Sequence, residues 1–195
     1  MGKFTAVSAE EFKNLQFGAG VLLKSFDPAN PVIEDSAIIC LTTGGISVTC
    51  TPKRVNDGAD IDNVDDDVLE FERLTGWDCG LGFTSLSISP SALKLALGAA
   101  DITDEDTVTK IMPRTELKDT DFEDAWWAGD MKTGGMAAAK LANAFSTGGL
   151  ALKTTKDGKG NLAVNLKGFR TLKDPNKVPM EFYVATDEQI NGEGA

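Results

Sequence analysis

Apolar and polar residues alternate with a period of two along most of the chain, and this pattern predicts β-strands rather than helices. The longest alternation covers residues 77–88, where the apolar positions shift by one residue after Thr84, which predicts a β-bulge. Residues 162–166 and 180–184 alternate in the same way. Residues 137–143 are rich in alanine, which favours helix, but they lie between glycine-rich turns, and we interpret them as a strand. Further strands are predicted at 21–24, 37–41, 46–50, 68–74 and 150–154, and a short helical turn at 119–124.

One helix is well marked in the sequence. Ser89 can cap its N-terminus, Pro90 stands at the first helical position, and Gly98 ends it. A second helix is predicted to start at Ser8, because Glu11 follows three residues later and completes a capping box. Both helices are short, so they are expected to accompany a fold built mainly of strands.

The predicted elements add up to eight to ten short strands with one or two small helices. This content predicts a mainly β fold, a β-sandwich or partial barrel with one flanking α-helix. Residues 1–185 are expected to form one domain, and the polar, glycine-rich residues 186–195 a mobile tail or arm. Two connections, 26–36 and 51–67, are longer than ordinary turns, and long loops in compact domains are commonly functional. The Asp157-Gly158 pair predicts a hairpin turn.

Charge is large and unevenly distributed. The 195-residue chain has a formal net charge of −11, so the molecule as a whole is expected to repel nucleic acid. Residues 27–130 carry 22 acidic and 7 basic side chains, whereas residues 131–180 carry 2 acidic and 9 basic side chains. The distribution fits either a mixed solvated surface or acidic and basic faces that meet between neighbouring copies. Neither a membrane span nor a secretory signal is predicted, because no apolar run approaches the required length.

The composition also limits the possible chemistry. The sequence has no histidine, which excludes Ser-His-Asp and Cys-His catalytic arrangements and histidine-ligated metal sites. It contains neither a P-loop nor a complete dinucleotide fingerprint. We therefore expect no enzymatic activity, no cofactor and no metal. The three cysteines, Cys40, Cys50 and Cys79, have no C-x-x-C spacing and are expected to be reduced and to pack as small hydrophobic residues.

The strongest polar cluster lies within residues 51–67, which contain six aspartates. Three interpretations stay open: a calcium site, a solvated loop tip, and a contact arm that reaches a neighbouring subunit. The spacing does not match an EF-hand loop, which disfavours calcium. Spaced aliphatic residues favour the contact arm. The residues nominated for that contact are Asp57, Asp60, Ile61, Asp62, Asn63 and Val64.

A short internal repeat is visible in two Thr-Gly-Gly triplets, each between two β-like runs. Paired glycines permit positive φ angles and a close approach of two backbones. Gly44 and Gly45 in the first triplet, and Gly148 and Gly149 in the second, are therefore candidates for turns that matter in assembly. Two unrelated turns are the alternative interpretation.

Several short motifs, taken in order and with their spacing, resemble the major tail protein, or tail tube protein, of long-tailed bacteriophages with non-contractile tails. The likeness runs from about Leu15 to Val184, nearly the whole chain. The motifs are Leu15-Gln16-Phe17-Gly18-Ala19-Gly20, Thr43-Gly44-Gly45, Asp60-Ile61-Asp62-Asn63, Trp126-Trp127-Ala128-Gly129-Asp130, Asn143-Ala144-Phe145-Ser146-Thr147-Gly148-Gly149, Lys156-Asp157-Gly158-Lys159-Gly160 and Val178-Pro179-Met180-Glu181-Phe182-Tyr183.

This resemblance implies a structural virion protein. Six subunits would form a ring in which inner strands close into a shared barrel, and stacked rings would form a hollow tail tube. DNA would pass through the channel to the host without specific binding. The loop at 51–67 would reach the next ring. Tape-measure and tail terminator proteins would be partners, and the tube would be assembled in the host cytoplasm and reside in the virion tail.

Two further hypotheses concern surfaces. Strand alternation within 68–74 nominates Glu70 and Glu72 as acidic residues that face the channel, where negative charge would keep DNA from adhering. The alternative function is a monomeric β-sandwich that binds carbohydrate or a host surface, for which Trp126 and Trp127 would have to be exposed.

Overall fold

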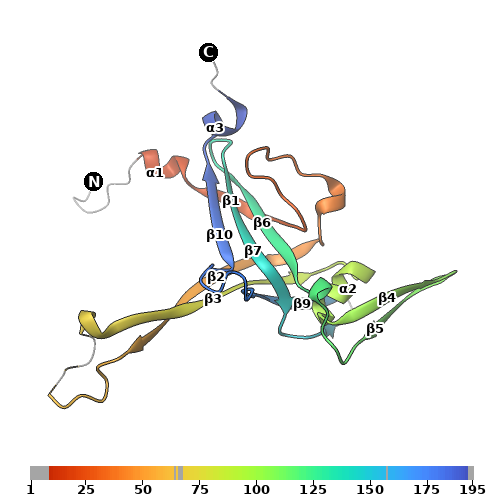
Figure 1. Cartoon of the computed structure of the whole chain (residues 1–195). Coiled ribbons are helices and arrows are strands. Elements are labelled where there is room, and N and C mark those ends of the chain that lie inside the picture. Colours follow the sequence, from red (N-terminus) through yellow and green to blue (C-terminus); the bar gives the residue numbers. More distant parts are fainter. Residues whose placement is uncertain (1–8, 64, 66–67, 157, 193–195) are drawn as a thin grey trace.

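The computed structural model describes residues 9–63, 65, 68–156 and 158–192, and it is mainly β, as the alternation predicted (Figure 1). The strands are β1 (Gln16–Leu23), β2 (Thr42–Asn56), β3 (Glu72–Ser85), β4 (Ala100–Glu105), β5 (Val108–Pro113), β6 (Glu123–Met131), β7 (Met136–Ser146), β8 (Ala151–Lys153), β9 (Asn161–Gly168) and β10 (Met180–Ala185). The α-helices are α1 (Ala9–Lys13), α2 (Pro90–Leu97) and α3 (Asp187–Asn191), with 3-10 turns at Asp35–Ala37, Leu69–Phe71 and Asp119–Asp121.

All strand pairs named here are antiparallel, and eight strands share one sheet. The order is β1-β6-β7-β9-β3-β2, with β10 beside β7 and β8 beside β9, whereas β4 and β5 form a separate hairpin. Strand β7 pairs with β10 through Leu141 and with β9 from Ala144 onward. Asn143 lies between these two pairings and has a positive φ of 47°. This break lets the sheet bend, so that its two halves enclose the core.

The main core lies between the two halves of the bent sheet. Its buried side chains come from both halves and from α2, and they are Leu22, Ile39, Cys40, Cys79, Leu81, Phe83, Ala92, Ala96, Ala125, Ala139, Leu141, Ala144, Leu162, Val164, Leu166 and Met180. Apolar burial of this kind is the dominant favourable term in folding. The bent sheet with α2 against it confirms the predicted sandwich-like fold with a flanking helix.

Helix α2 forms where the sequence predicted it. The Ser89 hydroxyl oxygen accepts a hydrogen bond from the Ala92 N–H at 3.1 Å, and Pro90 occupies the first turn. The helix ends at Gly98, whose φ is +76°. A Cβ at this position would lie 2.7 Å from the Phe145 ring, so the packing also requires glycine. Ala92 and Ala96 face the core and fix the helix against the sheet.

A second apolar cluster covers the opposite face of β1, β6, β7 and β10. Trp126 and Leu23 are buried there under the connection between β1 and β2. The Trp126 ring lies 5.9 Å from that of Phe26 and 5.6 Å from that of Tyr183, measured between ring centroids. The long loop predicted at 26–36 therefore serves partly as a lid on this cluster.

Several predicted boundaries are wrong. β2 continues through Asn56, so the first six residues of the loop predicted at 51–67 are strand. A 3-10 turn occupies Leu69–Phe71 within the strand predicted at 68–74. β3 ends at Ser85, and the shift after Thr84 marks the end of the strand instead of a bulge. The strand predicted at 37–41 retains only an isolated bridge, between Leu23 and Ile38.

Other expectations are confirmed or fall outside the described residues. The alanine-rich segment is strand β7, and β8 and the 3-10 turn at Asp119–Asp121 form as predicted. α1 lies at the predicted N-terminal position, although Ser8 is outside the described residues. Residues 187–191 of the predicted tail form α3. Of the Asp157-Gly158 pair, Asp157 is outside the described residues.

The cysteine prediction is wrong for two of the three residues. Cys50 on β2 and Cys79 on β3 stand directly opposite each other in the register, with their Cα atoms 4.0 Å apart, and form a disulfide. Cys40 is a free, buried thiol, as expected. Burial raises the pKa of the Cys40 thiol, so it stays protonated at neutral pH.

Candidate assembly surfaces

The edge strand β10 carries the most exposed pair of apolar residues on a sheet edge. It pairs with β7, and no strand pairs with its other edge within the described part of the chain. Phe182 is 61% exposed and Val184 is 68% exposed. A groove of about 540 Å³ runs beside them and is lined on its far side by Asp27, Pro28 and Ala29. An unpaired edge with exposed apolar side chains is a typical template for association.

A second open edge lies at β8, which pairs with β9 on one side only among the described residues. Leu150, Leu152 and Ile88 are exposed here. Ile88 and Leu152 lie together beside Gly160, because a Cβ on that glycine would be 3.4 Å and 3.9 Å from their terminal carbons. The exposed lysines of this hairpin are Lys153, Lys156 and Lys159. This edge is therefore apolar and basic.

The third open edge belongs to β2, which forms a long arm with β3. β9 pairs with β3 only from Gly80 to Ser85, so no other strand of the described residues lies beside the outer part of the β2–β3 ribbon. The ribbon extends well away from the body of the molecule (Figure 1). Val55, Leu69 and Leu74 are exposed along it. Apolar residues on an isolated ribbon indicate a surface that another chain covers.

The tip of this β2–β3 arm is locally ordered. The Arg73 side chain donates two hydrogen bonds to Asp57, at 2.8 and 2.9 Å. This bond lowers the pKa of Asp57 below its ordinary value. Gly58 is buried against Phe71, where a Cβ would lie 2.9 Å from the ring, and its N–H donates to the Asn56 side chain at 2.8 Å. The arm therefore ends in a defined turn.

The residues nominated for contact between subunits mostly lie at this tip. Asp60, Ile61 and Asp62 are exposed, and Asn63 has a positive φ of 64°. Asp57 is instead held by Arg73, and Val64 lies outside the described residues. Within the described chain, no group of three or more acidic or cysteine side chains is placed to hold a metal ion.

The nominated channel acids do not share a strand face. Glu70 lies in the 3-10 turn and is exposed, whereas Glu72 begins β3 and lies 3.7 Å from Arg54 across the ribbon. The alternation that nominated them is therefore interrupted by the turn.

The two Thr-Gly-Gly triplets have different structural roles. Gly44 and Gly45 have φ angles of +74° and +85° and lie in a bulge within β2, where the pairing register shifts between Thr43 and Ile46. Gly148 and Gly149 lie in the connection between β7 and β8, and only Gly149 has a positive φ, of +68°.

A second arm, β4–β5, was not predicted from the sequence. It is exposed along most of its length and carries Asp101, Asp104, Glu105 and Asp106 against one lysine, Lys110. Its sequence signal is weak, because Ile102 is the last apolar residue of β4, and the apolar residues of β5 (Val108, Ile111 and Met112) do not keep a period of two. The arm is therefore acidic, like the tip of the β2–β3 arm.

Arg114 joins the β4–β5 arm to the body. Its guanidinium pairs with Asp121, whose side chain is 1% exposed, and its Nε lies 2.8 Å from Asp101. Burial acts to raise the pKa of Asp121. Hydrogen bonds from the Lys118 N–H and from Arg114 lower it by more than burial raises it, so the pKa lies below the ordinary value. Asp121 is therefore a buried anion that depends on this pairing.

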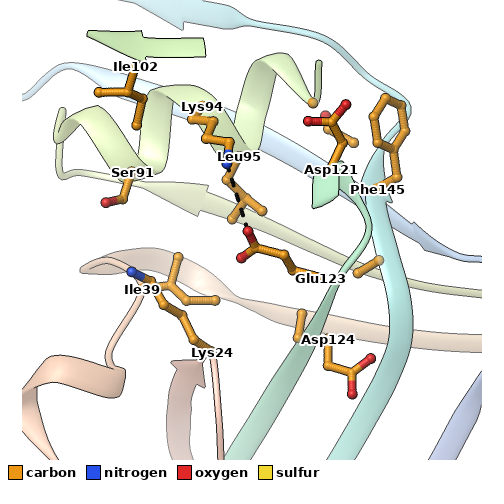
Figure 2. Close-up of a pocket in the computed structure, with 14 residues that line it drawn as sticks. Lys24, Ile39, Ser91, Lys94, Leu95, Ile102, Asp121, Glu123, Asp124 and Phe145 are labelled. Carbon is orange, nitrogen blue, oxygen red and sulfur yellow. Dashed lines mark ion pairs between the residues drawn. The ribbon is translucent and has the colours of Figure 1, made fainter. Parts of the chain in front are cut away.

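A small cavity of about 170 Å³ lies between α2, β6 and β7 (Figure 2). Figure 2 shows the Lys94 ammonium group pointing toward Glu123, 3.8 Å away. Ser146 at its wall donates a hydrogen bond to the Ala96 carbonyl at 2.7 Å. Ligand pockets commonly enclose 300–1,000 Å³, so this space is too small for a typical ligand. We interpret it as a packing gap.

The tryptophans are not the exposed platform that the binding-module hypothesis required. Trp126 is 7% exposed and packs between Phe26 and Tyr183. Trp127 is half-buried, and its Nε1–H donates to the Ala19 carbonyl at 3.0 Å. Gly20 permits this contact, because a Cβ there would collide with the Trp127 ring. Both side chains are structural.

No protein-family model matches the sequence, and no curated protein matches it either. Among the described residues, no helix has the length and apolar character needed to cross a membrane. Function is therefore inferred from the open edges and arms of this chain.

Proposed function

We propose that this chain is a structural subunit that associates with identical copies into stacked rings, forming a tube through which DNA passes. The observation that carries the proposal is a pair of sheet edges, at β8 and β10, that no strand of the described residues covers and that are both lined with exposed apolar side chains. Closing a ring between such edges satisfies the backbone groups that a monomer leaves open.

Charge supports a head-to-tail contact between these edges. The β8 edge is flanked by Lys153, Lys156 and Lys159. By contrast, Asp27 lines the groove beside β10, and Glu188 lies in the first turn of α3, the helix that follows β10. Complementary charge fixes the orientation of partners and favours different patches meeting over identical ones. Heterologous contacts of this kind close into rings when the rotation permits.

The β2–β3 arm supports stacking of rings. It is a ribbon with exposed apolar residues and an acidic tip, and it extends beyond the body of the subunit. Residues 131–180, with their excess of basic side chains, provide complementary charge on the same chain. A projecting arm that engages the next ring converts closed rings into a filament.

The resemblance of the sequence to phage tail tube proteins gives this assembly its biological setting. In that setting the ring is a homo-hexamer, the tube lies in the virion tail after assembly in the host cytoplasm, and tape-measure and tail terminator proteins are its partners. The carbohydrate-binding alternative has lost its supporting observation, because Trp126 is buried.

The experiment compares two exposed apolar residues of equal exposure. Phe182 on the open β10 edge and Leu117, which lies outside any strand, are both 61% exposed. Light scattering after size exclusion and negative-stain electron microscopy would be applied to the wild-type chain, Phe182→Ser and Leu117→Ser over a concentration series. We expect rings or rods with the wild type and Leu117→Ser, and folded monomers with Phe182→Ser.

Two results would contradict this proposal. One is a wild-type chain that stays monomeric at high concentration and with tail-completion partners added. The other is a Phe182→Ser variant that assembles as the wild type does, because the β10 edge would then not be an interface.

A further inference from the structure

The outward side of β2, β3 and β9, opposite the main core, forms a small polar surface that we name the β2–β3–β9 outer face. A groove of about 620 Å³ follows it. Gly80 keeps the groove open and lets β9 approach closely, since a Cβ there would lie 2.7 Å from the Leu166 carbonyl oxygen. The uncharged residues that face outward and line the groove are Ser47, Thr49, Thr51, Gly80, Gly82, Thr147 and Asn165.

A single ion cluster interrupts this neutral surface. The Oδ1 atom of Asp78 on β3 lies 2.7 Å from the Nζ atom of Lys167 on β9. Its Oδ2 atom lies 3.6 Å from the Nζ atom of Lys53 on β2. One carboxylate thus holds two ammonium groups that come from the strands on either side of it. Farther along the ribbon, the Arg170 guanidinium lies over Gly76 and donates to the Pro175 carbonyl at 3.3 Å.

Stability gives little reason for this cluster. All three side chains are substantially exposed, and ion pairs between exposed groups contribute little to folding. The hydrogen bond from Lys167 lowers the pKa of Asp78, so the carboxylate remains ionised throughout the neutral range. The effect of Asp78 is therefore on the two lysines, because it is the ion-pair partner of both and lowers the net charge of the cluster from +2 to +1.

We propose that the β2–β3–β9 outer face is the surface along which duplex DNA passes, and that Asp78 weakens the binding of Lys53 and Lys167 to its phosphates. The location in a channel rests on the proposed function, whereas the masking is a property of each subunit. Hydroxyl and amide groups contact phosphate and sugar without regard to sequence. Two uncompensated lysines would bind the phosphates and release counterions, whereas a carboxylate beside them weakens this attraction and lets the DNA slide.

The first test measures DNA binding by the full-length chain in solution. Asp78→Asn releases both lysines without changing the shape of the side chain. Asp57→Asn is the matched control, because it removes the same charge and releases Arg73 on the β2–β3 arm. The probe is a short fluorescein-labelled duplex, followed by fluorescence anisotropy over a range of salt concentrations, with circular dichroism to verify folding.

We expect Asp78→Asn to bind about tenfold more tightly than the wild type and Asp57→Asn at low salt, with a salt dependence steeper by up to about two in log–log slope. Adding Lys53→Gln and Lys167→Gln to Asp78→Asn should abolish the gain. A folded Asp78→Asn variant that binds no better than Asp57→Asn overturns the masking, as does a gain that survives removal of both lysines.

The second test places the face within the assembly. Asn165→Cys would be labelled in assembled tubes with a small maleimide and with a polymer-linked maleimide too bulky to enter a channel, and Leu117→Cys serves as the comparison. We expect Asn165→Cys to react with the small reagent alone. Reaction with both reagents would place the face outside, and protection from both would show that a neighbouring copy covers it. If no tubes form, the proposed function is wrong, but the anisotropy measurement still tests the effect of Asp78 on the two lysines, because it does not require assembly.

Discussion

The backbone N–H of Asn143 donates a hydrogen bond to the Asp124 carboxylate at 3.0 Å, which joins β6 to β7 at the residue where β7 exchanges one partner strand for another. The Asn143 side chain also donates to the Phe169 carbonyl, at 3.0 Å. Lys140 pairs with the same Asp124 at 2.7 Å. These contacts fix the corner at which the sheet bends over its core.

Substitutions at Asn143 should show how much its side-chain hydrogen bond and its left-handed backbone conformation each affect the free energy of unfolding. Its φ of 47° lies in the left-handed region, which glycine tolerates and alanine does not. Asn143→Gly should lose mainly the side-chain hydrogen bond, at about 1 kcal/mol. Asn143→Ala should be destabilised by about 1 kcal/mol more. Urea unfolding of both variants measures the difference, and equal stabilities would show that backbone conformation is not limiting there.

The buried pair of Asp121 and Arg114 should make stability depend on pH. The folded pKa of Asp121 lies below its unfolded value, so its contribution is present above the unfolded pKa of about 4. It is lost as pH falls through the folded pKa. Asp121→Asn should lower the free energy of unfolding by about 2 kcal/mol at neutral pH. Urea unfolding from neutral pH to acid should show a shallower decline for the variant, whereas parallel curves would assign the acid sensitivity to other carboxylates.

The disulfide predicts a specific thiol count. Alkylation of the unfolded, non-reduced chain should modify Cys40 alone, and prior reduction should expose three thiols, which mass spectrometry distinguishes. Reduction should lower the free energy of unfolding by about 2–4 kcal/mol, because the bond constrains the unfolded chain. A Cys50→Ser, Cys79→Ser double variant should be insensitive to reductant. Three alkylated thiols without reduction would show that the bond is absent.

The arm should control elongation separately from ring closure. Leu69 at the arm is 82% exposed, so Leu69→Asp should fold normally and form rings that fail to stack, because a charge cannot enter an apolar contact. Leu172, which is fully exposed between β9 and β10, provides the matched variant Leu172→Asp. Electron microscopy would count rings against rods. Rods of ordinary length from Leu69→Asp would remove the arm from the stacking contact.

The sequence was informative where a local rule determines structure. Ser89, Pro90 and Gly98 defined α2 because capping and φ preferences act over a few residues. The period-two pattern likewise placed β3, β9 and β10. The mainly β architecture follows from such local signals.

Most of the failures have a different cause, since they depend on residues distant in sequence. The Cys50–Cys79 bond requires the register of β2 against β3, which no spacing rule reveals. The exposed ribbon at 51–56 lacks an apolar face, so its strand character is not visible in the pattern. The Asp78 cluster combines side chains from three strands, and only the sheet order brings Lys53 and Lys167 to the same carboxylate.

The position of the disulfide has a mechanical consequence. The β2–β3 ribbon leaves the body of the molecule just beyond Cys50 and Cys79, and outward from there its two strands pair with each other and with no third strand of the described chain. A pull on the far end would separate hydrogen-bonded pairs one after another until it reached a covalent link. Force applied to the far end of the ribbon is thereby transmitted to the whole sheet, and the subunit resists unfolding from that end.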